Sequence, residues 1–243
     1  MKRLIKLEWK RNRLRTYHIA AVSIFIFLLA MLFLFAAIPR LEPTDTDMGP
    51  FLTYTGITSL YNILGIASFA IFSSVLAARF VVQDFTGPQA LLLFSYPISR
   101  SKILWAKLLL VFGYSVLANL LCGTTAFCLF FVSESLFPLS TASIRIEDMV
   151  TAFLSLLCSS IMAGGIGMIA LWFGFRKRSI SVTIIAAVIL AVVCCQFLGM
   201  TLFLPYLFFS LLVPVLCCAF LAGKSLFRQI KKMEVSLHDR TRV

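Results

Sequence analysis

The residues with the most promise for chemistry lie in one short segment, residues 79–107, between two long apolar blocks. Thr86 can cap a short helix, Pro88 suits its first turn, and Pro97 ends it because the residue before a proline is disfavoured as helical. Between the two prolines lies an apolar run, residues 91–94. The pattern predicts a short helix that presents this run to a partner molecule. A helix that lies at the membrane interface without a partner is the alternative.

The composition places this segment in a membrane protein. Of the 243 residues, 60% are hydrophobic and only 13% are charged, against about one quarter in soluble domains. The mean hydropathy is +0.98. Stretches of about 20 apolar residues, the length that crosses a bilayer core, recur along the chain. We predict an all-α polytopic membrane protein with six transmembrane helices, at residues 18–38, 56–78, 103–132, 149–175, 180–200 and 201–222.

The last two predicted spans are separated by little polar sequence. As a single helix, residues 180–222 would be about 64 Å long at ~1.5 Å per residue, twice the ~30 Å core of a bilayer. Gly199 and Pro205 suit a tight external hairpin or a shallow re-entrant turn. We therefore expect two crossings here.

The distribution of cations supports six crossings. With that number, every Lys and Arg except Arg40 and Arg145 lies on the same side as the two termini. Positive residues stay in the cytoplasm, so both termini are predicted to be cytoplasmic. The net charge of +12 then reflects topology and attraction to anionic membrane lipid. Nucleic-acid binding is not expected, because no soluble face gathers the cations.

Basic residues also mark the predicted membrane surface. Residues 1–17 set apolar side chains among cations, which indicates an amphipathic interfacial helix; a solvated basic arm is the alternative. Arg100, Lys102 and Lys107 are expected to hold the start of the third span at the surface by snorkelling. We divide the chain into the interfacial helix (1–17), a transmembrane domain (18–222) with a cytoplasmic segment at 79–102, and a basic cytoplasmic tail (223–243).

The sequence offers no pattern for catalysis, a metal or a cofactor. All seven cysteines fall inside predicted spans, where they behave as small apolar residues, and their doublets lack zinc-site spacing. No Asp or Glu lies inside a predicted span, which disfavours ion-coupled transport and intramembrane catalysis. Residues 223–225 resemble the end of a phosphate-binding loop, but Cys218 occupies the position of its first glycine. If the chain transports a substrate, we expect another subunit to supply the energy.

Small residues gather in the fourth predicted span. Such residues allow helices to approach closely, either between two subunits or within one. The positions concerned are Ala163, Gly164, Gly165, Gly167 and Gly174.

Together these features resemble the permeases of ABC-2 type ABC transporters. The basic N-terminal helix with Glu8 and the six-span layout extend the resemblance over essentially the whole chain. The small size resembles permeases that export antimicrobial peptides, including bacteriocin and lantibiotic immunity and bacitracin-resistance systems. The residues that carry the resemblance are Asp84, Thr86, Gly87, Leu91, Leu92, Tyr96, Pro97, Ser99, Arg100 and Lys107.

The resemblance implies a permease of the bacterial cell membrane that exports a hydrophobic or amphipathic substrate. The segment that contains these residues, with Phe94, would be a coupling helix that docks on a cytosolic ATP-binding subunit. Two such subunits would bind ATP and Mg, and a second permease, identical or homologous, would complete the assembly. This chain itself would bind no cofactor and would not be an enzyme. A membrane anchor or regulatory partner that recruits a cytosolic protein, and an energy-independent pore, are the alternatives.

Overall fold

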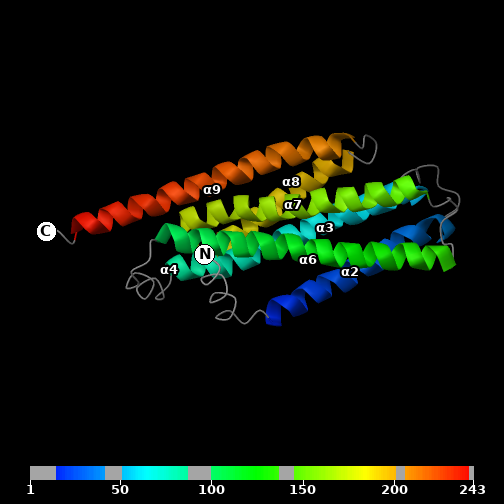
Figure 1. The fold of residues 1–243 in the computed structure, drawn as a ribbon, viewed down its shortest axis with the longest axis horizontal. Coiled ribbons are helices and arrows are strands. Elements are labelled where there is room, and N and C mark those ends of the chain that lie inside the picture. Colours follow the sequence, from blue (N-terminus) through cyan, green and yellow to red (C-terminus); the bar gives the residue numbers. More distant parts are fainter. Residues whose placement is uncertain (1–14, 42–50, 87–99, 137–144, 201–205, 241–243) are drawn as a thin grey trace.

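The structure of the protein is a computed structural model, and it consists of long apolar helices that run back and forth (Figure 1). The structure describes residues 15–41, 51–86, 100–136, 145–200 and 206–240. Six helices in this part of the chain are long and apolar enough to cross a membrane. In chain order they are α2 (Arg15–Leu41), α3 (Tyr54–Ala77), α6 (Arg100–Leu136), α7 (Ile146–Lys177), α8 (Ile180–Met200) and α9 (Tyr206–Arg240).

The number of spans and the all-helical class agree with the prediction for the described residues. The bounds of α8 are those predicted, and α2, α6 and α7 run beyond their predicted spans at both ends. Helix α3 begins two residues before its predicted span and ends one residue before the predicted end. Helix α9 continues without a break past the expected boundary at residue 222. The predicted interfacial helix (1–17) falls outside the described residues except for its last three positions, which begin α2. Residues 201–205, where a hairpin or re-entrant turn is predicted, are also outside them.

Helices α3 and α7 form the centre of the bundle, and both are mostly buried. Helix α7 contacts α3, α6, α8 and α9, while α2 packs on α3 and α6. The outer helices expose large apolar side chains: Ile19 of α2, Leu121 of α6 and Val192 of α8 are 60%, 63% and 62% exposed. Such a surface is stable against lipid and unstable against water. The fold therefore defines a multi-pass α-helical membrane protein.

The glycines of α7 explain how one helix packs against so many others, because each faces a different neighbour. A Cβ added at Gly164 would lie 2.9 Å from the Phe112 ring of α6, and one at Gly165 would lie 3.3 Å from Val215 of α9. One added at Gly167 would collide with Ser73 of α3. The small residues predicted to pack helices thus lie between helices of the same chain, and Ala163 beside them is fully buried.

The closest approach to α7 comes from α8, just after a tight turn. Arg178 adopts a left-handed backbone conformation (φ 51°) at the end of α7, and its N–H bonds back to the carbonyls of Gly174 and Phe175. The chain therefore reverses at once, and Thr183 of α8 lies directly over Gly174. Any side chain at position 174 would occupy the space of Thr183.

Polar side chains join the helices at a few points. Asn62 of α3 donates to Ser155 Oγ of α7 (2.8 Å) and accepts from Ser159 Oγ (3.3 Å). Trp172 Nε1 of α7 donates to Ser225 Oγ of α9 (2.8 Å). In a bilayer such bonds contribute about 0.6 kcal/mol each on average. They orient helices that close packing already holds together.

Replacing Gly174 with Ala is expected to destabilise the bundle by about 1–3 kcal/mol, because the added methyl group meets the Thr183 backbone as well as its side chain. Gly113→Ala of α6 is the matched control, since no atom lies within 4 Å of a Cβ there. Both changes gain the same helix propensity, so their difference isolates the collision. Denaturant titration in mixed micelles measures it, and equal stabilities of the two variants would contradict the packing described.

Candidate coupling site at the basic end of the bundle

The two ends of the bundle differ in charge. At one end, here called the basic end, α2 begins, α4 ends, α6 begins and α7 turns into α8; it lies toward the left in Figure 1. Its described cations include Arg15, Arg79, Arg176, Lys177 and Arg178. The described residues at the opposite end include two cations and three acidic residues: Arg40, Arg145, Glu134, Glu147 and Asp148. The candidate site lies at the basic end, where the predicted coupling segment is attached.

Helix α3 reaches the basic end through a change of helix type. It continues into a π-helical turn, η2 (Ala78–Val82), and then into α4 (Gln83–Thr86). The N–H of Gln83 bonds to the carbonyl of Ala78, five residues earlier. Such turns interrupt the regular α-helical pattern and are frequent at functional sites. After η2, Asp84 is 6% exposed and points into the bundle.

Asp84 forms an ion pair with Lys107 of α6. Lys107 Nζ donates to Asp84 Oδ2 and also to the carbonyl oxygen of Phe80 in η2, at 3.0 Å. Lys107 is 1% exposed. The prediction that Lys107 snorkels to the membrane surface was therefore wrong. The carboxylate and the Phe80 carbonyl give the ammonium group partners inside the bundle, so it has no need to reach water.

A buried ion pair in this position has one clear physical consequence. Each charge loses its hydration when it is buried, and the cost is several kcal/mol per ion unless the partner compensates for it. Separating Asp84 from Lys107 is therefore unfavourable. The pair fixes the position of α4 relative to α6 on either side of the segment that joins them.

Helix α2 completes the base of the site. The Tyr17 ring packs edge-on against Phe80, with centroids 5.3 Å apart. One residue later, His18 Nδ1 lies 2.8 Å from the hydroxyl of Tyr114 on α6. Helix α2 therefore contacts both η2 and α6 near the basic end.

The structure brings together Asp84 and Lys107 among the predicted coupling residues. Thr86 is the last residue of α4 and Arg100 the first of α6, so both stand where the helices enter and leave the segment. The remaining predicted residues lie outside the described part of the chain: Gly87, Leu91, Leu92, Phe94, Tyr96 and Pro97.

One buried acidic residue lies at the far end of α6, outside every predicted span. Helix α6 extends to Leu136, beyond the predicted end of its span at residue 132, and Glu134 lies in this extension. Glu134 is 2% exposed, and its Oε1 accepts a hydrogen bond from Tyr54 of α3 at 3.0 Å. The sequence shows the glutamate but not the tyrosine that faces it. The contact belongs to the end opposite the candidate site.

The described residues also bear on metal and redox chemistry. All seven cysteines are free thiols, distributed over α6, α7, α8 and α9. Within the described ranges, no three His, Cys, Asp or Glu side chains come together as a metal site would require.

Comparison with known proteins identifies one distant similarity. The chain is 24% identical over 190 residues to an uncharacterized protein, YcbO, of Bacillus subtilis (strain 168), and the alignment covers 77% of this chain and 80% of that protein. No protein-family model and no solved structure matches the chain.

Breaking the buried ion pair from one side is expected to cost about 3–5 kcal/mol of folding free energy, because the remaining charge stays buried without its counter-ion. Lys107→Met and Asp84→Leu should each show this loss. The double variant should recover most of it, because two apolar side chains replace both charges. Denaturant titration of the purified variants in mixed micelles provides the double-mutant cycle. Strictly additive losses in the double variant would show that the two residues do not interact.

Proposed function

We propose that this chain is the permease subunit of an ATP-binding-cassette exporter in a bacterial cell membrane. The basic end of the bundle faces the cytosol, as the positive-inside rule favours. A separate ATP-binding subunit docks on the segment between α4 and α6, with two copies serving two permease subunits. The substrate is hydrophobic or amphipathic, and an antimicrobial peptide is the class that we favour.

The observation that carries the proposal is the Asp84–Lys107 ion pair. These two residues open and close the stretch that resembles the ABC-2 coupling segment, and they lie 23 positions apart in the chain. The pair fixes the two ends of the segment relative to each other. A segment that transmits motion from a partner protein benefits from such an attachment, because a flexible attachment would dissipate the movement. The geometry therefore supports the coupling proposal.

The mechanism follows from this attachment. Closure of the two ATP-binding subunits would move the docked segments, and each ion pair would pass the movement to α3 and α6 of its own permease. Because α7 packs against both of these helices, it would shift with them. The path for the substrate would then open between the spans. ATP and Mg remain on the partner subunit throughout.

Substitution in the apolar run tests the partner. Full-length chain purified from its own cells is expected to bring with it an ATPase that carries a Walker motif. Leu92→Asp or Phe94→Asp should abolish that association, because a charge would replace the apolar contact. Ser181→Asp is the matched control: it adds the same charge at an exposed site in the first turn of α8, where an acid suits the helix dipole. Retention of the ATPase by both segment variants would overturn the coupling assignment.

Deletion of the chain tests the substrate. Cells without it are expected to become more susceptible to at least one hydrophobic or amphipathic peptide, and the intact chain should restore resistance. The Lys107→Met/Asp84→Leu double variant should fold but restore resistance poorly if the charges also serve coupling. Growth inhibition across a broad peptide panel provides the measurement. Unchanged susceptibility throughout the panel would exclude peptide export without affecting the fold.

A further inference from the structure

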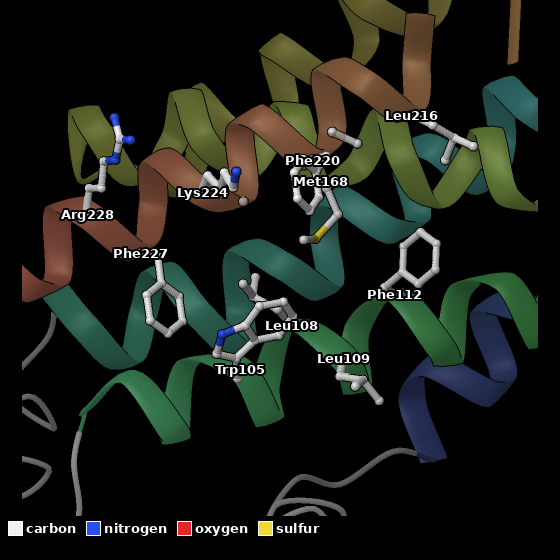
Figure 2. Close-up of a pocket in the computed structure, with 12 residues that line it drawn as sticks. Trp105, Leu108, Leu109, Phe112, Met168, Leu216, Phe220, Lys224, Phe227 and Arg228 are labelled. Atoms are coloured by element: carbon white, nitrogen blue, oxygen red, sulfur yellow. The ribbon is translucent and has the colours of Figure 1, made fainter. Parts of the chain in front are cut away.

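An apolar groove opens on the outer surface of the bundle between α6 and α9, toward the basic end (Figure 2). Its volume is about 750 Å³, within the ~300–1,000 Å³ of small-molecule sites. Trp105, Leu109 and Phe112 of α6 line one wall, Leu216 and Phe220 of α9 line the other, and Met168 of α7 lies behind them. The groove therefore has apolar walls from two helices and a third helix as its floor.

The walls of this groove face away from the protein core. Trp105, Leu109 and Phe220 are 50%, 57% and 62% exposed. Closer to the basic end the rings of Trp105 and Phe227 lie 5.7 Å apart and bridge the two helices. Lipid can therefore enter the groove from the side without any movement of the helices.

Two cations on α9 distinguish this groove from an ordinary lipid-facing surface. Lys224 and Arg228, one turn apart, both line it and are both exposed. Lys224 Nζ lies 4.9 Å from the centroid of the Phe220 ring, which keeps the ammonium group beside the apolar wall. Among the described residues that line the groove, none is acidic. An apolar channel with two cations at one end matches a ligand that has an acyl chain and an anionic head.

We propose that the groove binds one anionic glycerophospholipid from the leaflet at the basic end of the bundle. An acyl chain lies between α6 and α9 against Leu109 and Phe220, and the phosphate lies at Lys224 and Arg228. Bound in this way, the lipid joins two helices that otherwise share few contacts. The site is independent of the transport activity proposed above.

Two substitutions test the site: one fills the groove, and the other removes a cation. Gly223 lines the groove, and no atom lies within 4 Å of a Cβ placed there, so Gly223→Phe fills the groove without a collision at the backbone. Gly199→Phe is its control, because Gly199 has equally open space but lies at the end of α8 away from the groove. Lys224→Gln removes one cation, and Lys177→Gln removes an exposed cation at the same end outside the groove.

The full-length protein, mixed with phosphatidylglycerol and phosphatidylcholine of identical acyl chains, is expected to retain phosphatidylglycerol in native mass spectrometry. Gly223→Phe should abolish this retention. Lys224→Gln should lower the preference for phosphatidylglycerol about fivefold, the effect of about 1 kcal/mol per cation at an anionic surface. Both controls should behave as the parent. Unchanged retention in Gly223→Phe, or an unchanged preference in Lys224→Gln, overturns the proposal.

A second measurement reports on the groove directly. With Trp9 and Trp172 replaced by Phe, Trp105 is the remaining tryptophan, and its emission should be quenched more by brominated phosphatidylglycerol than by brominated phosphatidylcholine in vesicles. Gly223→Phe should remove that difference. If Gly223→Phe instead converts a dimer to a monomer and leaves lipid retention unchanged, the groove is an interface between two copies and the lipid proposal fails.

Discussion

The close approach of four helices to α7 is the constraint on which the rest of this bundle depends. Lipid solvates apolar side chains as well as the protein interior does, so burial of apolar surface gives helices in a bilayer little reason to associate. Helix association must therefore come from van der Waals contact at short range. The successive small residues of α7 permit such contact on several sides at once. Helices α3, α6, α8 and α9 all pack against α7. The groove between α6 and α9 exists because each of these two helices contacts α7 more extensively than it contacts the other.

Polar contacts then set the rotation of each helix. Asn62 orients α3 against α7, and Tyr54 with Glu134 orients it against α6 at one end. Asp84 and Lys107 do the same at the other end. Helix α3 and its continuation through η2 into α4 are therefore held against α6 at both ends by buried contacts. The π-helical turn η2 lies between α3 and Asp84. An uninterrupted α-helix would turn Asp84 to a different side of the helix.

Much of this arrangement follows from the sequence, and the missing parts have a common cause. Hydropathy and the positions of the cations predict the six spans, because span length and charge bias are properties of single segments. Helix rotation depends on the partner helix, so the neighbours of Lys107 in the chain predict a surface residue where the structure has a buried one. The contact of Glu134 with Tyr54 cannot be predicted for the same reason, since nothing near Glu134 in the sequence reveals its partner. The partners of the α7 glycines likewise become apparent only when the helices are assembled.

The ion pair at the base of the segment also has a consequence for the proposed coupling. Because Asp84 and Lys107 are bound to each other, α4 and α6 cannot move apart at this point without separating two buried charges. If the segment is a coupling helix, a force on it would reach α3 and α6 together. Those two helices would then move as one unit against the outer helices.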